Sequence, residues 1–377
     1  MRLLFFIKII VVGLLMTNLV SCQESKSNES LPKPSNLNEA VNLTEKLLKE
    51  LNYEYPGLSI AIGIHDSIYY AGGYGYANVS KKEVVNSNHA FRYYSLSKSI
   101  TGIALIKLIE LGKLDLESYV VNYLPNLPEH YKSIKVKHLI GHTAGIRGYN
   151  KGEWLKISQG NCTKPEEAFN VFINDPLTAK PGNGDKYSSF GYVLLSGLIE
   201  SVSGQSYMSF LEEYIFNPLD IQSIHLDRSN DIKSEVEYYE KWNLNRITGK
   251  LSTEVNNTCK FGAGGLVGNA EDYAKLQLAM INSEIVDEKY SKIYYSSLKN
   301  SNGDLVNYAF GLSDRKDDIG RKYNAHSGSG MGANSVFVSY PEEKLVIVIL
   351  GNIESKEINN RIGDISELFL GLLNNEE

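Results

Sequence analysis

Apolar residues recur at two different spacings along the chain, and these spacings predict its first regular elements. Residues 40–51 carry apolar side chains at helical spacing, which predicts an amphipathic helix that packs by one face (Ala40, Leu43, Leu47, Leu48 and Leu51). Two short apolar runs follow at 57–64 and 67–71, with only His65 and Asp66 between them. Two such runs around a short polar turn predict a β-hairpin.

The last part of the chain carries the same signals. Apolar runs at 335–340 and 345–350 flank the polar turn 341–344, which predicts a second hairpin. The next segment has a helical stripe that predicts a carboxy-terminal helix (Ile358, Ile362, Ile365, Phe369 and Leu372). Strands at both ends with helices and loops between them predict an α+β fold. In this fold one antiparallel sheet is assembled from both termini and flanked by helices, and a largely helical region is inserted.

The first residues are typical of a secretory signal. Arg2 precedes an apolar block that Lys8 interrupts, and the uninterrupted part is shorter than the roughly 20 apolar residues that a membrane span needs. Leu-Val-Ser-Cys at 19–22 resembles the bacterial lipoprotein signal, in which the cysteine receives the lipid. We therefore expect a signal peptide at 1–21 and lipidation of Cys22. The alternative is an ordinary cleaved signal followed by a chance cysteine.

The segment after the signal predicts a membrane-attached domain. Residues 22–36 are polar and without periodicity, as in a flexible tether, and they lead into a folded domain at 37–377. Gln23 follows the cysteine where an aspartate would argue for retention at the inner membrane. We therefore expect a lipid anchor in the outer membrane of a bacterial cell envelope, facing the periplasm or the cell surface.

The composition indicates a globular protein and excludes several classes of function. Of 377 residues, 42% are hydrophobic and 22% charged, which is too mixed for a disordered or coiled-coil chain. Lys and Arg total 38 against 44 Asp and Glu, without a basic run, so we expect no nucleic-acid partner. Cys162 and Cys259 can pair in an oxidising compartment, or they can remain two buried thiols. The sequence has no CxxC, HExxH or P-loop, so we expect neither a metal site nor a cofactor.

One serine and lysine pair has the spacing and the context of a nucleophile and its base. Ser95 and Lys98 stand three residues apart at the start of a strongly apolar helix at 100–109, so their side chains share a face. A serine hydroxyl needs a base, and a lysine desolvated against apolar neighbours has a lowered pKa that suits this task. On spacing alone, a capping serine beside a lysine is the alternative, because three other pairs share the spacing (Ser30/Lys33, Ser296/Lys299 and Ser313/Lys316). None of these three opens a long apolar helix.

The segment 91–102 (FRYYSLSKSITG) resembles the active-site segment of the serine β-lactamase-related hydrolases. That family includes class C β-lactamases, D-alanyl-D-alanine carboxypeptidases, D-aminopeptidases and esterases. Further segments match in the family's order, namely 134–146, 181–189, 261–272 and 326–328. The chain is therefore identified as a member of this family over about 38–372, which implies a β-lactamase/transpeptidase-like fold.

The resemblance also implies roles for individual residues. Ser95 would be the acylated nucleophile, Lys98 its base, and Tyr187 the residue that relays protons to the leaving group and later activates water. Substrate binding is implied for five residues (Ser189, His326, Ser327, Gly328 and Ser329). The N–H groups of Ser95 and Ser329 would form the oxyanion hole. His142 lies in a matching segment, and we interpret it as a structural residue.

Two departures from the family pattern affect the substrate that we expect. Ser189 stands where the family's Y-x-N motif has an amide, and His326, which is mostly neutral near pH 7, stands where many members have the lysine of K-T-G. Both departures favour esters or D-amino-acid amides and peptides over β-lactams. The alternatives are a true β-lactamase or penicillin-binding D,D-carboxypeptidase, and a non-catalytic lipoprotein that binds cell-wall material. We expect no obligate protein partner.

Overall fold

The computed structural model describes residues 32–184, 186–229 and 236–373. From Lys33 onward the chain forms one compact unit. The expected signal peptide and the expected lipidation site at Cys22 lie outside the described residues, as does most of the expected tether. Within the described part, none of the helices has the length and the hydropathy that a membrane span requires.

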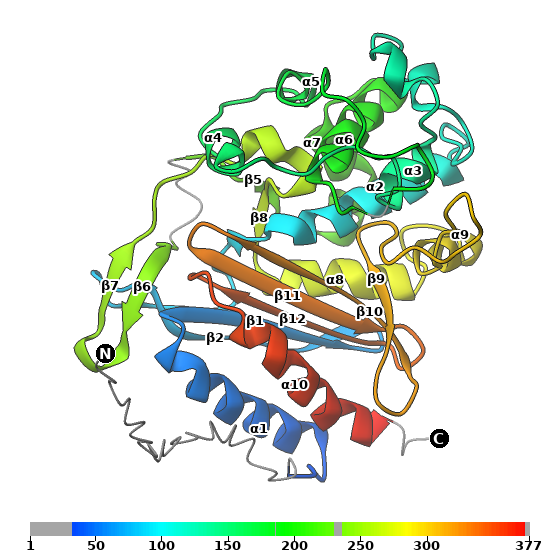
Figure 1. Cartoon of the computed structure of the whole chain (residues 1–377). Helices are drawn as coiled ribbons and strands as arrows, with labels where there is room; N and C mark the ends of the chain where they lie inside the picture. Colours follow the sequence, from blue (N-terminus) through cyan, green and yellow to red (C-terminus); the bar gives the residue numbers. More distant parts are fainter. Residues whose placement is uncertain (1–31, 185, 230–235, 374–377) are drawn as a thin grey trace, which may run out of the picture. The chain divides into compact units, whose positions relative to one another are not determined.

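A seven-stranded antiparallel sheet forms the centre of this unit, in the order β3-β2-β1-β12-β11-β10-β9 (Figure 1). Its strands are β1 (Gly57–Ile64), β2 (Ser67–Asn78), β3 (Glu83–Val84), β9 (Ser313–Lys316), β10 (Lys322–Gly330), β11 (Ala333–Tyr340) and β12 (Leu345–Gly351). β1 pairs with β12 along its length, so strands from the two ends of the chain meet in the middle of the sheet. The α+β prediction and both predicted hairpins are confirmed.

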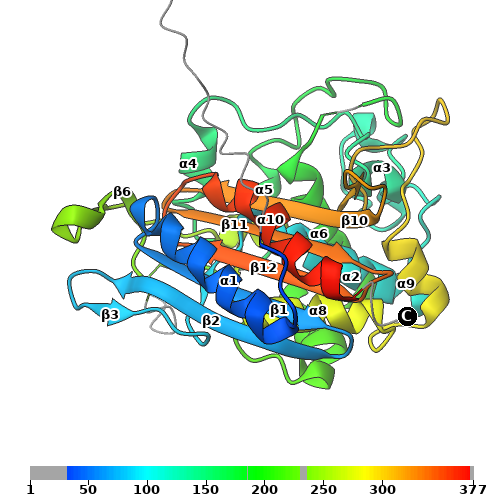
Figure 2. The same ribbon diagram turned by 90° about the horizontal axis from the view of Figure 1, so that it is seen from below.

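Helices cover both faces of the sheet because its middle strands are apolar on both sides. Along β12, Ile347 contributes to the cluster under α1 (Leu37–Glu50) and α10 (Glu357–Leu373), while its neighbour Val348 contributes to the larger core on the opposite face. Figures 1 and 2 show α1 and α10 side by side across the first face. α8 (Ala270–Ile281) packs against β1 and β12 on the other.

A largely helical region lies between β3 and β9, as predicted. Besides α8, its α-helices are α2 (Ser97–Glu110), α3 (Val136–Ile140), α4 (Glu153–Ile157), α5 (Glu166–Phe169), α6 (Ser189–Ser203), α7 (Tyr207–Leu211) and α9 (Glu288–Tyr294). Short strands accompany them, in a three-stranded sheet of β4 (Phe91–Arg92), β8 (Leu266–Gly268) and β5 (His225–Leu226) and a hairpin of β6 (Tyr239–Asn243) and β7 (Thr248–Leu251). Two 3₁₀ turns bear on the site, η2 (Tyr94–Leu96) and η8 (Thr258–Ala263).

Helix α2 runs through the middle of this region and is buried around almost its whole circumference. This confirms the helix predicted from the apolar run at 100–109. Gly102 allows the segment before β9 to pack directly on the helix, because a Cβ atom there would lie 2.1 Å from the Phe310 carbonyl oxygen. The rigid, buried α2 therefore provides the support for the residues at its amino-terminal end.

Candidate active site

Ser95 lies in η2, the single turn between β4 and α2. The backbone before it is held in place from two sides, since the Tyr93 N–H donates to the Leu266 carbonyl at 3.0 Å and the Ser335 hydroxyl donates to the Tyr93 carbonyl at 2.7 Å. Tyr94 has a φ of 45°, in the left-handed region, and its hydroxyl donates to the Met331 carbonyl at 2.9 Å. Unfavourable φ values in non-glycine residues concentrate at functional sites, where the surrounding structure maintains them.

Lys98 lies in the first turn of α2 and points its amine at Ser95. The Lys98 Nζ atom is 3.2 Å from Ser95 Oγ and 3.3 Å from Ser189 Oγ, and it donates a hydrogen bond to the Ala263 carbonyl. The side chain is fully buried. Burial and the positive charge of Lys260 lower the pKa of Lys98 well below its usual value, which favours the neutral amine. The structure thus brings together the two residues that the sequence paired.

Tyr187 is the third residue of the site, and its ring faces the Lys98 amine. Lys98 Nζ sits 4.8 Å from the centre of the Tyr187 ring, and the Tyr187 hydroxyl is 3.4 Å from His326 Nε2. Burial raises the pKa of the Tyr187 hydroxyl, although a hydrogen bond with Ser95 partly opposes the shift. The residue as a whole is 37% exposed. A protonated phenol at this position can donate a proton to a departing group.

His142 holds the segment that carries Tyr187. The Ser188 N–H donates to His142 Nδ1 at 3.1 Å, and the His142 ring lies 4.4 Å from the Tyr187 ring. His142 is buried, and this burial, with a smaller contribution from the nearby Lys98, lowers its pKa well below the usual histidine value. Its contacts are of the structural kind that the sequence suggested.

His326 is a neutral residue of the site. Its Nδ1 atom is 2.8 Å from the Ser327 carbonyl, which can only accept, so Nδ1 carries the proton and Nε2 is free to accept from Tyr187. Burial and the nearby Lys98 lower the pKa of His326 to about 3. The position that holds a lysine in many family members is therefore uncharged here at neutral pH.

The part of β10 from His326 onward does not pair with β9. β9 pairs with β10 only from Lys322 to Ala325, so residues 326–329 do not pair with β9, and the side chains of Ser327 and Ser329 are exposed. A strand edge of this kind can pair with an extended substrate. His326 and Ser327 also line a pocket of about 640 Å³.

Gly328 brings this strand against the turn that carries Ser95. A Cβ atom at Gly328 would lie 2.2 Å from the Tyr93 carbonyl oxygen and 2.9 Å from the Ser95 backbone nitrogen, so only glycine allows this approach. The main chain at 328–329 is therefore next to the Ser95 N–H. The oxyanion hole formed by the Ser95 and Ser329 N–H groups stays a prediction, and the Ser329 hydroxyl itself donates to Glu354 at 3.2 Å.

Ser189 begins α6, and its hydroxyl is engaged within the site. Besides lying near Lys98, it forms a hydrogen bond with Tyr149, a half-buried residue of the loop before α4. Substrate binding by Ser189 stays a prediction. The structure places its hydroxyl where it helps to hold Lys98 and Tyr149.

Sequence reasoning did not identify Tyr308 as part of the site. Its ring centre lies 5.5 Å from that of Tyr187 and 5.4 Å from that of His326, so it extends the aromatic wall. Tyr308 belongs to the irregular segment before β9, where the sequence has no motif. The Ala263 carbonyl, which Gly264 and Gly265 follow in the chain, was also missed.

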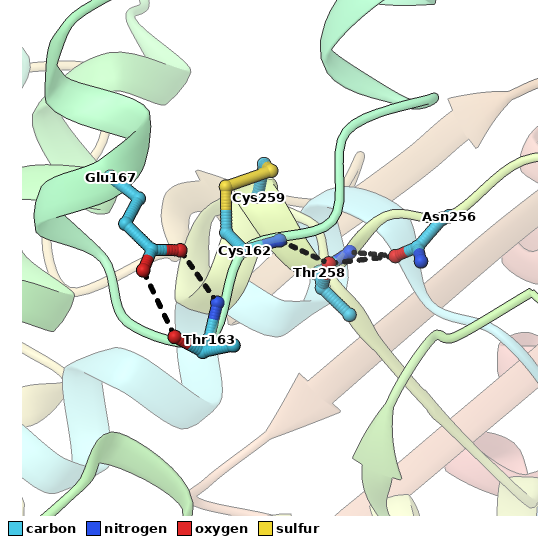
Figure 3. The surroundings of a disulfide bond; sticks show 6 residues. All are labelled: Cys162, Thr163, Glu167, Asn256, Thr258 and Cys259. Carbon is cyan, nitrogen blue, oxygen red and sulfur yellow. Dashed lines mark hydrogen bonds between the residues drawn. A yellow bond between two sulfur atoms is a disulfide. The ribbon is translucent and has the colours of Figure 1, made fainter.

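A disulfide between Cys162 and Cys259 fixes η8 next to this site (Figure 3). The sequence left open whether these cysteines pair, and the structure shows that they do, across 97 residues. The Cys162 N–H donates to the Thr258 hydroxyl at 3.1 Å, which joins the same two segments a second time. Because η8 ends at Ala263, this cross-link also secures the carbonyl that holds Lys98.

The site contains the elements of acyl transfer. Among residues 32–184, 186–229 and 236–373, no group of three or more His, Cys, Asp or Glu side chains is arranged to hold a metal ion. What is present is a serine, a buried amine and a phenol within contact of one another, beside a free strand edge. These are the parts of a covalent serine mechanism.

Comparison with known proteins gives the family. The family model described as Beta-lactamase matches residues 41–365. The chain belongs to the beta-lactamase family. It is a serine hydrolase, and the recognition made from the sequence is confirmed.

Relatives from Bacillus subtilis and from humans match most of this chain. A penicillin-binding protein of Bacillus subtilis is 24% identical over 314 residues, which cover 80% of this chain and 69% of that protein. The human mitochondrial serine beta-lactamase-like protein LACTB is 26% identical, covering 86% of this chain and 74% of its own length.

Solved structures share the fold. The octameric penicillin-binding protein homologue from Pyrococcus abyssi superposes with a TM-score of 0.70 at 26% identity, covering 83% of this chain and 73% of that chain. The D-amino acid amidase from Ochrobactrum anthropi gives a TM-score of 0.74 at 20% identity, covering 89% of this chain and 99% of that chain. The β-lactamase/transpeptidase-like fold expected from the sequence is thereby confirmed.

Proposed function

We propose that this serine hydrolase cleaves acyl substrates through a covalent intermediate on Ser95. The observation that carries the proposal is the fully buried Lys98 amine, 3.2 Å from Ser95 Oγ. Because burial lowers the pKa of Lys98, its neutral amine can take the hydroxyl proton while the oxygen attacks the substrate carbonyl.

Acylation then needs a proton for the leaving group. As the Ser95 oxygen bonds to the carbonyl carbon, its proton passes to Lys98, and the bond to the leaving oxygen or nitrogen breaks. Tyr187 is positioned to protonate that atom, since its hydroxyl is protonated and hydrogen bonds with Ser95. We propose that the N–H groups of Ser95 and Ser329 bind the negative oxygen that forms on the way. The proton held by Lys98 then returns to Tyr187. In the second half of the reaction water attacks the acyl carbon and passes a proton to the Lys98 and Tyr187 pair, the bond between that carbon and the Ser95 oxygen breaks, and the proton returns to Ser95 as the acid is released.

The substrate class that we propose is esters or D-amino-acid amides and peptides. Neutral His326 provides no positive charge for the carboxylate that penicillins and cephalosporins carry. The Ser189 hydroxyl is shorter than an amide and already contacts Lys98 and Tyr149. The aromatic wall of Tyr187 and Tyr308 fits an uncharged or aromatic group.

A substrate panel tests this assignment. The purified protein is incubated with an uncharged aryl ester, with the D and L forms of phenylalanine amide, and with a chromogenic cephalosporin. We expect the ester or the D-amide to be hydrolysed with a kcat/KM roughly 100-fold or more above that for the cephalosporin, because the carboxylate finds no charged partner. Mass spectrometry of the trapped intermediate should place the acyl group on Ser95. Efficient cephalosporin turnover would show instead that the protein is a β-lactamase.

We also propose that Cys22 carries a lipid that anchors the protein in the outer membrane, facing the periplasm or the cell surface. The sequence at 19–22 and the polar tether after it support this proposal. The Cys22→Ser variant is expected to move from the membrane fraction to the soluble fraction and to lose metabolic labelling by a fatty acid. Continued membrane attachment of this variant would contradict the anchor.

A further inference from the structure

Lys260 is a second buried lysine beside the catalytic pair, and the proposed mechanism does not use it. It lies in η8, three residues before the carbonyl that binds Lys98, and only 5% of its surface is exposed. No hydrogen-bond acceptor or carboxylate among the described residues lies within bonding distance of its ammonium group. Buried lysines without a partner are rare, because removing an ammonium from water is costly.

Asp227, the acidic group whose charge acts on Lys260, is already paired with another residue. Asp227 accepts a hydrogen bond from Arg92 Nε at 2.9 Å and a second from the Asn257 side chain. Arg92 and Asp227 therefore form a complete buried pair, and Lys260 adds one further positive charge to this cluster. Two aromatic rings provide the remaining contact, with Lys260 Nζ 5.1 Å from the centre of the Tyr94 ring and 5.9 Å from that of Trp154.

This extra charge is held close to Lys98. Tyr94 directly precedes Ser95, and η8 touches Lys98 through the Ala263 carbonyl. The disulfide at Cys259 and the packing of η8 on α6 fix the backbone segment that carries Lys260. The other charged, titratable or polar groups that face Lys98 from neighbouring elements carry no net charge in their ordinary forms (Ser95, Tyr187, Ser189, Tyr192, His142 and His326).

We propose that Lys260 is a positioning residue whose buried positive charge keeps the neighbouring Lys98 amine unprotonated and ready to accept the proton of Ser95. Two like charges in a space with little water repel each other strongly. This repulsion opposes protonation of Lys98, whose amine in water would hold its proton at neutral pH. The positive charge of Lys260 contributes to the lowered pKa of Lys98, after burial. Burial lowers the pKa of Lys260 itself only to about 8, so it remains charged at neutral and acidic pH, where the effect is needed.

The test is the pH dependence of kcat/KM for an uncharged aryl ester, and it rests on the proposed function. The acidic limb of this profile reports protonation of the free enzyme's base. In Lys260→Met the limb should move to higher pH by about one unit, a roughly tenfold loss of kcat/KM on the limb, while the alkaline plateau stays close to wild type. Lys260→Arg retains the charge and should keep the wild-type limb.

Further variants separate this role from a structural one. Lys113→Met removes an exposed lysine at the far end of α2 and should leave the profile unchanged. Lys260→Met should unfold at the same temperature as wild type or higher, since it removes a buried charge that has no hydrogen-bonding or ionic partner among the described residues. Lys260→Gln is a second neutral variant, for use if Lys260→Met folds poorly. An unshifted acidic limb in the neutral variants, or the same shift in Lys260→Arg, would overturn the proposal. A higher KM for anionic substrates with an unmoved limb would assign Lys260 to substrate binding instead. If wild type neither hydrolyses the ester nor is labelled on Ser95 by a fluorophosphonate, the proposed function itself fails.

Discussion

Replacing Ser95 by alanine is expected to abolish hydrolysis of every substrate that the protein accepts, with kcat reduced roughly 10⁴-fold or more. The reason is that no acyl-enzyme can form without the Ser95 oxygen, and the Lys98 amine 3.2 Å away has no hydroxyl to activate. The measurement is steady-state turnover of the best ester or amide, together with labelling by a fluorophosphonate probe. The variant should fold normally, because the hydroxyl supports no buried structure other than the site.

The matched control is Ser296→Ala, which removes an exposed serine that has the same three-residue spacing from a lysine. Ser296 follows α9, and its hydroxyl donates to the Ile293 carbonyl at the end of that helix. This change should therefore leave activity unaltered. Covalent labelling of Ser95→Ala at another residue, or turnover comparable with wild type, would show that the nucleophile has been misassigned.

Replacing Lys98 by methionine is expected to lower kcat/KM roughly 10²- to 10⁴-fold, which is the range for loss of a general base. Methionine fills the buried space and leaves Ser95 and Tyr187 in position. Lys98→Arg should be equally impaired, because a guanidinium stays protonated and cannot accept a proton near neutral pH. Single-turnover labelling of Ser95 by the probe measures the lost base directly.

The stability of these variants gives an independent check on Lys98. In the folded protein burial lowers the pKa of Lys98, while the unfolded chain holds the proton up to the ordinary lysine value. The unfolded state therefore binds more protons between those two pKa values, and stability should rise with pH across that window. Lys98→Met should lack this dependence and have a higher midpoint of thermal unfolding at neutral pH. Wild-type activity with an unchanged pH profile in Lys98→Met would transfer the role of base to another group.

Local features of the chain explain why so much of the fold could be predicted. β1 and β12 have nearly continuous apolar sequences bounded by polar turns, and α10 has a clean helical stripe. Ser95 and Lys98 are also a local pair, because three residues at a helix start bring two side chains onto one face whatever surrounds them. Tyr187 and His326 came only from the family resemblance, since no spacing predicts a contact across 139 residues.

Other parts of the site had no local signal. Lys260 sits in a segment without periodicity, and Tyr308 in an irregular stretch before β9, so neither stood out among the chain's many lysines and tyrosines. The pairing of Cys162 with Cys259 could not be decided from the sequence, because the distance between two cysteines 97 positions apart depends on how the chain between them folds.

By itself the sequence determined the α+β class, the family, the buried helix behind Ser95 and the replacement of a charged lysine by His326. The class and the helix follow from side-chain type and short-range spacing, while the family and the lysine replacement follow from the resemblance of ordered motifs. Both kinds of signal can be read without knowing how the chain packs. Only the tertiary structure decided that Lys98 is fully desolvated, that the Ala263 carbonyl and Ser189 hold it, that the edge of β10 is free, and that Lys260 adds an unpaired charge nearby. Burial and electrostatic coupling arise between residues that are far apart in the chain, and they exist only once α2, η8, α6 and β10 have packed together.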